Sequence, residues 1–286
     1  REKVAFQKRI WKEYVFEKQT VRELHGRHGK DRRTLKEFLN VYRAPEKKHD
    51  PRKINLVVDA LYFGERKEAT SWCAVCFRDP KRKENLWWTF CHTETTSVYV
   101  EGRKYLENLG YAILSVTGDG FGGLRQAFSD IPFQMCHVHM ERIVVNGTTR
   151  KPILEAGQAL LALTRSLHQK INEEDFKFYL KKYLEKYHTF LNEKTTNSLT
   201  GESSLTHEPL HKASLSLVRF LPYLFTFKTN QDISRTTNSL EGHFSHIRDV
   251  VGVHRGLTRP KMERVLHSIF LASTIAPTKK KLKHVL

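Results

Sequence analysis

The feature that most constrains the fold is the run INLVVDALYFG (54–64), which is apolar almost throughout but contains Asp59. A short apolar run between polar, turn-forming segments is typical of a buried β-strand. An ionised carboxylate is costly to bury unless it is paired with a cation or binds a metal. We therefore expect Asp59 to face a cleft beside a sheet, although an aspartate of this kind, taken alone, is more often a cap or turn residue.

Two segments after this run, 69–79 and 85–95, are rich in aromatic and β-favouring residues and are separated by a charged loop. With the first run they predict a three-stranded antiparallel meander. The sequence then predicts a helix ending at Gly110, a buried strand entering a Gly-rich loop, a short helix, and a strand or strand-to-helix junction, at 97–110, 111–124, 124–130 and 133–144.

This order of elements is that of the ribonuclease H-like fold, an α/β architecture with a mixed sheet flanked by helices. In that fold the first and fourth strands are neighbours, which would bring Asp59 beside Asp119 in SVTGDGFGG. The glycines around Asp119 permit close approach of a ligand or backbone, but the segment lacks the lysine and spacing of a phosphate-binding loop. Two carboxylates held together suit Mg²⁺, which prefers oxygen ligands.

A third carboxylate is expected from the helix in TTNSLEGHFSHIRDVVGVHRGLT (236–258), where Glu241 borders the apolar stripe. The stripe has helical spacing and consists of Leu240, Phe244, Ile247 and Val251; a polar face beside it carries Asn238, Glu241, Ser245 and Arg248. Glu141 and Glu263 are competing candidates without such polar neighbours. Without the two aspartates, Glu241 would be read as a glutamate stabilised by the helix dipole.

The N-terminal segment is strongly basic, with 15 Lys+Arg against 8 Asp+Glu in the first 50 residues. It predicts a helix over 3–16, then a short helix capped by Thr20 and reaching Leu24, a turn bracketed by Gly26 and Gly29, and a further helix beginning at Asp31. Two short helices around a Gly-containing turn, the second opening with Arg32 and Arg33, resemble a DNA-binding helix-turn-helix. An ordinary charged helical hairpin is the alternative.

We expect six segments along the chain. These are a helical DNA-binding segment, a linker, the first part of the ribonuclease H-like domain, an all-helical insertion, the second part of that domain with the glutamate helix, and a basic tail, at 1–43, 44–53, 54–146, 147–234, 235–276 and 277–286. The chain begins at Arg1 without an initiator Met, which leaves open whether a segment precedes it.

Charge is the dominant property of the composition, with 49 Lys+Arg against 31 Asp+Glu, a formal net charge of +18 and a pI of about 9.8. Such a balance favours a polyanionic partner, and the alternative is an ordinary basic soluble protein. No window approaches the roughly 18 apolar residues of a membrane span, and no signal peptide is visible. Four cysteines do not make a disulfide framework, so we expect a reducing, cytoplasmic and nucleoid-associated setting.

Four blocks of the sequence, VVDALYFG, TGDGFGGL, CHVHMERI and TTNSLEGHFSHIRDVVGVHRGL, resemble in content and order the signatures of Mutator-type insertion-sequence transposases of the DDE superfamily. The resemblance covers about residues 54 to 275. It implies a catalytic, metal-binding triad of Asp59, Asp119 and Glu241, separated by 60 and 122 residues, with the helical insertion accounting for the longer separation.

The resemblance also implies an activity. Two Mg²⁺ (or Mn²⁺) ions would activate water to hydrolyse a phosphodiester at the transposon end, and the freed 3′-hydroxyl would attack target DNA. The partners implied are double-stranded DNA and a second copy of the chain, as a homodimer or a higher assembly. Asn238 and the Cys-x-x-His pair Cys136 and His139 are expected to support the site, with DNA contacts from Arg32, Arg33, His243, His246, Arg248 and Arg255.

Three alternatives stay open. A zinc site is disfavoured because Cys73 and Cys76, three residues apart on a strand, point to opposite faces. A nuclease or resolvase of the same fold would cleave DNA without strand transfer. A non-catalytic DNA-binding relative of transposases would need none of the three carboxylates.

Overall fold

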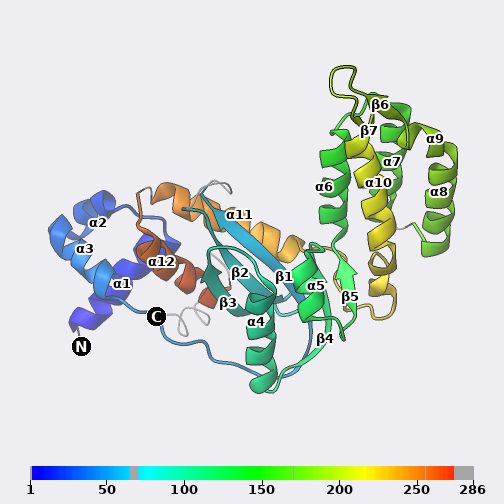
Figure 1. Cartoon of the computed structure of the whole chain (residues 1–286). Helices are drawn as coiled ribbons and strands as arrows, with labels where there is room; N and C mark the ends of the chain where they lie inside the picture. The colour runs from blue at the N-terminus through cyan, green and yellow to red at the C-terminus, as the bar shows by residue number, and fades with distance from the viewer. Residues whose placement is uncertain (1, 65–69, 170, 255, 274–286) are drawn as a thin grey trace. The chain divides into compact units, whose positions relative to one another are not determined.

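The computed structural model describes residues 2–64, 70–169, 171–254 and 256–273 (Figure 1). The chain forms two compact units. The first unit comprises residues 1–54, 58–112 and 238–286, and the second comprises residues 55–57 and 113–237. No helix among the described residues has the length and apolar character needed to cross a membrane.

A five-stranded mixed sheet has the strand order β3-β2-β1-β4-β5. Its strands are β1 (Lys53–Phe63), β2 (Trp72–Asp79), β3 (Glu84–Cys91), β4 (Ala112–Gly118) and β5 (Phe133–Met135). β2 and β3 are antiparallel, whereas β4 and β5 are parallel. The predicted strands are confirmed, and so is the expectation that the first and fourth strands are neighbours.

In the first unit, helices cover both faces of the β2–β3 pair. Trp87 and Trp88 are adjacent on β3, so their side chains point to opposite faces. Trp87 packs against Phe77 and leaves room only for the bare backbone of Gly102 on α4 (Thr96–Asn108). Trp88 stacks on Phe270 of α12 (Arg259–Ala272), with the ring centroids 5.8 Å apart. The Asp59 strand therefore lies in a sheet with α4 on one face and α12 on the other.

The end of α4 follows the prediction closely. Gly110 has a φ of 93°, its N–H donates to the carbonyl of Glu107, and the N–H of Tyr111 donates to that of Leu106. This pair of bonds is the Schellman arrangement, which requires a left-handed residue at the position after the helix. The expected helix end at Gly110 is thus confirmed, and β4 begins two residues later.

The N-terminal segment forms α1 (Glu2–Phe16), α2 (Val21–His28) and α3 (Arg32–Val41). Thr20 and Glu23 form a capping box at the start of α2, and Asp31 caps α3 by accepting from the N–H of Arg33. The expected end of α2 at Leu24 is wrong. The helix continues through Gly26 to His28, and Gly29, whose φ of 62° places it in the left-handed region, is its C-cap.

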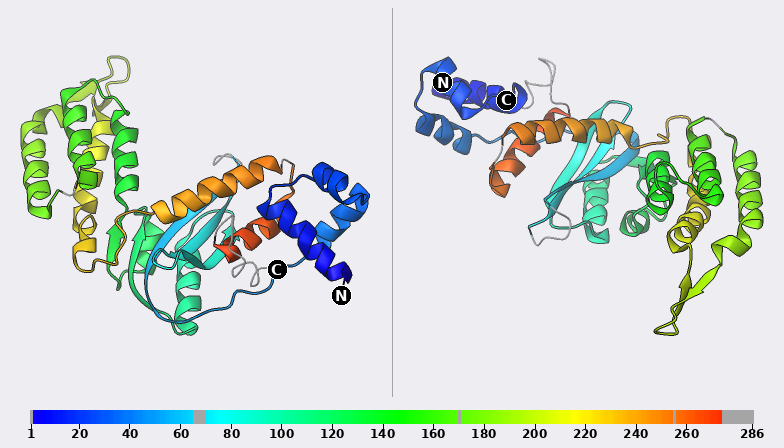
Figure 2. Two further views of the ribbon diagram at one scale, coloured as in Figure 1. Left: turned by 180° about the vertical axis from the view of Figure 1, so that it is seen from behind. Right: turned by 90° about the horizontal axis from the view of Figure 1, so that it is seen from above.

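These three helices belong to the first unit, and α1 packs against α12. The indole N–H of Trp11 donates to Oγ of Ser268 over 3.0 Å, and both residues are buried. Tyr14 stacks on His254, whose Nε2 lies 2.9 Å from the carbonyl oxygen of Tyr14. The left view of Figure 2 shows α1, in dark blue, beside α12, in red-orange.

The second unit is largely helical after β5. Its main helices are α5 (Gly122–Ala127), α6 (His137–Thr148), α7 (Glu155–Ser166), α8 (Glu173–Lys186), α9 (His188–Leu191) and α10 (Glu208–Phe220). The expectation of an all-helical insertion is wrong, because β6 (Lys194–Thr196) and β7 (Ser203–Leu205) form an antiparallel hairpin. The β-branched threonines of β6 favour a strand, and Gly201, with a φ of 73°, permits the turn.

A candidate metal centre on two carboxylates

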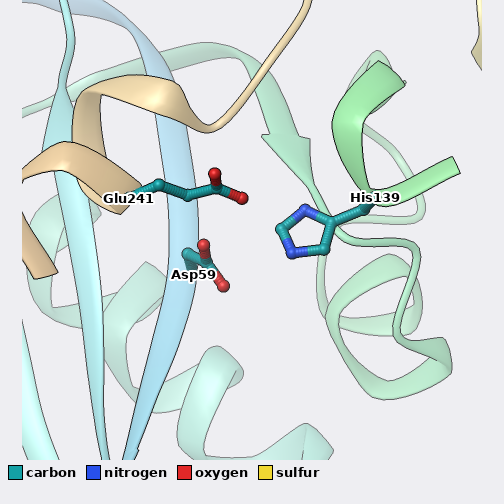
Figure 3. A group of neighbouring side chains, drawn as sticks. All are labelled: Asp59, His139 and Glu241. Atoms are coloured by element: carbon teal, nitrogen blue, oxygen red, sulfur yellow. The ribbon is translucent and has the colours of Figure 1, made fainter. Parts of the chain in front are cut away.

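Asp59 and Glu241 come from distant parts of the sequence and lie together in the first unit. Asp59 is in the middle of β1, and Glu241 is in the first turn of α11 (Asn238–Val253). A carboxylate oxygen of each lies within 4.8 Å of one from the other, and both side chains are half-buried. Figure 3 shows the two carboxylates pointing in the same direction, and it also labels His139, a residue of the second unit.

The face of the sheet on which Asp59 lies can be identified from its neighbours. Its carboxylate lies beside that of Glu241 on α11, and His243 of α11 packs edge-on against Phe270 of α12, so Asp59 is on the face that α11 and α12 cover. Cys76 is opposite Trp88 in the β2–β3 register, and Trp88 contacts α12. Oδ1 of Asp59 accepts from the N–H of Ala60 over 2.8 Å, which restricts the orientation of the carboxylate.

Glu241 is fixed by the packing of α11. The buried positions of the helix are Leu240, His243, Phe244, Ile247 and Val250. The predicted stripe is therefore correct at three positions, while Val250 rather than the half-buried Val251 completes it. Asn238, Ser245 and Arg248 are exposed, as expected for the polar face. Glu241 lies at the border between the two faces, which lets its carboxylate reach β1.

His243 does not lie on the polar face, so its prediction as a DNA-contacting residue is wrong. Its side chain is 7 % exposed and packs edge-on against Phe270. Its Nε2 is 3.1 Å from Nδ2 of Asn85, a fully buried residue of β3. An imidazole is amphipathic, and here its apolar face and one nitrogen both find buried partners. The sequence does not predict this burial, because a histidine beside the apolar stripe is not itself counted as an apolar residue.

Each of the two competing glutamates forms an ion pair with an arginine. Glu263 accepts from Nε of Arg259 over 2.8 Å. Glu141 accepts from Nε of Arg165 over 2.8 Å and lies 3.0 Å from Nε2 of His168, and the hydrogen bond from Arg165 lowers its pKa. Neither belongs to the carboxylate group around Asp59. Of the three candidates, Glu241 is the one that meets Asp59.

Asp119 lies in the second unit, directly after β4. Its Oδ1 accepts from the N–H of Phe121 over 2.9 Å, and the side chain is half-buried. Gly120 has a φ of 84°, and a Cβ there would meet Sδ of Met135 at 2.7 Å. The sharp turn therefore needs glycine and sets the orientation of Asp119. That its carboxylate joins those of Asp59 and Glu241 stays a prediction.

The Cys-x-x-His pair is at the start of α6 in the second unit. Cys136 is the residue before the helix, and its Sγ accepts from the N–H of Thr237 over 3.3 Å. Burial raises the pKa of this thiol. Nδ1 of His139 is 3.4 Å from Oγ1 of Thr237, the residue that precedes α11. Both residues of the pair thus contact Thr237, just before α11. That they support an active site stays a prediction.

The remaining DNA-binding candidates that the structure describes are on the surface. Arg32 and Arg33 are exposed at the start of α3, and Nε of Arg33 also forms a 3.3 Å ion pair with Glu37. Arg248 and His246 are exposed on α11. Arg255 and the predicted basic tail, 277–286, lie outside the described residues.

The donor set at the centre fits a hard divalent cation. Two carboxylates within 4.8 Å repel one another, and partial burial strengthens that repulsion. A cation between them would offset both charges, and oxygen donors are the ligands that Mg²⁺ and Mn²⁺ prefer. The half-buried position also leaves access for water and substrate.

Comparisons with known proteins do not assign the chain to a family. No family model matches the sequence, and no curated protein matches it. Among solved structures, the chain is similar to one in the cryo-EM structure of the simian T-cell lymphotropic virus intasome in complex with PP2A regulatory subunit B56 gamma. That match has 13% identity, covers 67% of this chain and 72% of the other, and has a TM-score of 0.23. A score this low carries no argument about fold or function.

Proposed function

We propose that this protein is a DDE transposase with a ribonuclease H-like catalytic domain, which hydrolyses DNA at transposon ends and joins those ends to target DNA. The observation that carries the proposal is the convergence of Asp59 and Glu241 within 4.8 Å. Two carboxylates that lie this close together, one on β1 and one on α11, suit a cation between them.

The strand order supports the same proposal. A sheet in which β1 lies between β2 and β4 is the arrangement expected for a ribonuclease H-like fold. In our proposal, Asp119 at the end of β4 supplies the third carboxylate of the centre, since neighbouring strands can present residues at one edge of a sheet. The net charge of +18 and the exposed arginines at the start of α3 favour DNA as the partner.

The division of roles follows from the positions of the residues. Asp59, Asp119 and Glu241 would hold two divalent ions, which in such sites activate the attacking oxygen and stabilise the leaving oxygen. Arg248, two turns after Glu241 on the exposed face of α11, would offset the charge of the DNA backbone near the scissile phosphate. Asn85 and the core positions of α11 hold the helix so that Glu241 keeps its orientation.

A metal titration tests the centre without DNA. Mn²⁺ added to the wild type should raise the thermal unfolding midpoint, because a ligand that binds only the folded state stabilises it. Asp59→Asn and Glu241→Gln should each weaken Mn²⁺ binding at least tenfold. Asp249→Asn is the matched control, because it makes the same chemical change at an exposed position of the same helix. Equal Mn²⁺ binding in all four proteins would contradict the proposed centre.

A strand-transfer assay tests the reaction. A labelled DNA fragment carrying the sequences that flank the coding gene, incubated with a plasmid target and Mg²⁺, should yield joined molecules with the wild type. Asp59→Asn, Asp119→Asn and Glu241→Gln should each abolish the product, while Asp249→Asn retains it. Cleaved fragments without joined products would instead indicate a nuclease or resolvase. DNA binding with neither product would indicate a non-catalytic DNA-binding protein.

A further inference from the structure

Two cysteines face each other across the β2–β3 pair, away from the carboxylates. Cys73 near the start of β2 and Cys91 at the end of β3 are directly opposite in the antiparallel register. Their sulfur atoms are 3.4 Å apart, and neither is in a disulfide. Opposite residues in an antiparallel pair have Cα atoms about 4.5–5.5 Å apart, which falls within the range that a disulfide spans.

The two thiols are suited to different steps of an exchange reaction. Cys73 is fully buried, and the hydrogen bond with Cys91 together with this burial raises the pKa of its thiol. Cys91 is half-buried at the end of its strand. The hydrogen bond with Cys73 lowers the pKa of the Cys91 thiol and outweighs burial and the negative charge of Glu94, which raise it. An accessible, more acidic thiol beside a buried partner is the usual arrangement of an attacking and a resolving cysteine.

We propose that Cys73 and Cys91 form a redox-active dithiol that low-molecular-weight disulfides, such as oxidised glutathione, convert into a cross-strand disulfide. The Cys91 thiolate attacks one sulfur of the small disulfide, whose S–S bond breaks and releases one thiol after it takes a proton. The Cys73 thiol then gives up its proton and attacks Sγ of Cys91, which releases the second small thiol. Two protein thiols are oxidised and one small disulfide is reduced to two thiols.

The position of the pair defines what the bond would change. Cys73 and Phe77 are four residues apart on β2, and Trp87 and Cys91 are four residues apart on β3, so all four share the face covered by α4. Asp59 and Cys76 lie on the other face. The disulfide would therefore fasten β3, the edge strand of the sheet, without touching the carboxylates. The inference consequently stands whether or not the chain binds a metal.

Intact-mass analysis of the full chain tests the proposal directly. After incubation with oxidised glutathione, the wild type should lose two hydrogens, a peptide pair linking Cys73 to Cys91 should appear after digestion, and dithiothreitol should reverse both. The thermal unfolding midpoint of the oxidised protein should rise by about 5 °C, because the bond closes a loop that the unfolded chain would otherwise leave open.

Two serine variants separate the roles of the cysteines. Cys73→Ser should stop at a single glutathione adduct on Cys91, because the resolving thiol is missing. Cys91→Ser should not react, because the remaining thiol of the pair is buried. The double variant Cys76→Ser/Cys136→Ser is the matched control and should still form the disulfide. A wild type that stays fully reduced, or identical behaviour of the two single variants, would overturn the proposal.

Discussion

Gly120 and Gly122 lie two residues apart in the loop after β4, but their surroundings differ sharply. At Gly120, an added Cβ would lie 2.7 Å from Sδ of Met135 and 2.8 Å from the ring of Phe220, and φ is 84°. At Gly122, the first residue of α5, nothing lies within 4 Å of an added Cβ. Only the first glycine is required by the turn that orients Asp119.

We predict that Gly120→Ala destabilises the protein by about 3 kcal/mol, from strain at positive φ and from the clash with two core side chains. Gly122→Ala should be neutral or slightly stabilising, because alanine is the better helix former. Urea unfolding of the two variants measures the difference. Equal midpoints would mean that the loop rearranges freely and does not fix Asp119.

A buried polar network at the scale of helices and strands connects β2, β3, α11 and α12. Asn85 on β3 accepts from Nη1 of Arg78 over 2.6 Å and donates to the carbonyl of Phe270 over 3.0 Å, and its Nδ2 is also 3.1 Å from His243. His243 is two residues after Glu241. The network therefore fixes the rotation of α11 about its axis and, through it, the direction of Glu241.

We predict that Asn85→Ala lowers the free energy of unfolding by about 3 kcal/mol, because it leaves Arg78 and His243 buried with fewer partners. It should also weaken Mn²⁺ binding, since Glu241 loses its fixed orientation. Asn108→Ala, at an exposed position of α4, is the control. If Asn85→Ala lowered stability but left Mn²⁺ binding unchanged, the network would not orient Glu241.

The N-terminal helices contain a buried carboxylate, that of Glu13. Glu13 is 4 % exposed and is bonded to His28 (2.8 Å), Arg27 (3.2 Å) and Arg9 (3.0 Å). Burial by itself raises the pKa of Glu13, but the hydrogen bonds from His28 and Arg9 outweigh it, and the net shift is downward. The carboxylate thus joins α1 to the end of α2.

We predict that Glu13→Gln destabilises the protein by about 2 kcal/mol at pH 7. A carboxyl group whose pKa is lowered on folding contributes its stability above the unfolded value of 4.5 and loses it as the pH falls through the folded pKa. The difference between wild type and variant in the free energy of unfolding should therefore disappear as the pH falls below 4.5. Urea unfolding as a function of pH measures it, with Glu37→Gln, which removes an exposed ion pair, as the control. A gap that did not change with pH would contradict the assignment.

At the scale of the whole molecule, the net charge of +18 should dominate DNA affinity. We predict that the binding constant for a DNA duplex falls steeply with salt, because each phosphate contact releases counterions. Arg32→Ala should reduce the slope of log K against log salt by about 0.9. Lys186→Ala should leave it unchanged, because that lysine is paired with Glu155 at 2.7 Å. Fluorescence anisotropy over a salt series makes the comparison, and equal slopes would exclude Arg32 from the interface.

Local patterns in the sequence determined most of the secondary structure. The strands of the sheet, the end of α4 at Gly110 and the cap of α3 by Asp31 all follow from residue preferences that act over a few neighbours. The same patterns identified Asp59 and Glu241 as acidic residues in unusual surroundings. The β6–β7 hairpin was not predicted, because its strands of three residues are too short to produce an alternating pattern.

Only the tertiary structure decided which of these residues meet. The spacing of apolar residues along α11 could not show whether Val250 or Val251 is buried, because the buried face of a helix depends on the elements that pack against it. It also could not show that His243 is buried, since the partner Asn85 lies on β3, far away in the sequence. The approach of Glu241 to Asp59, and of Cys73 to Cys91, depends on strand order and register. Those are set by contacts between distant segments, whereas caps, turns and apolar runs are set by neighbours, and this is why the sequence alone determined the elements but not the sites.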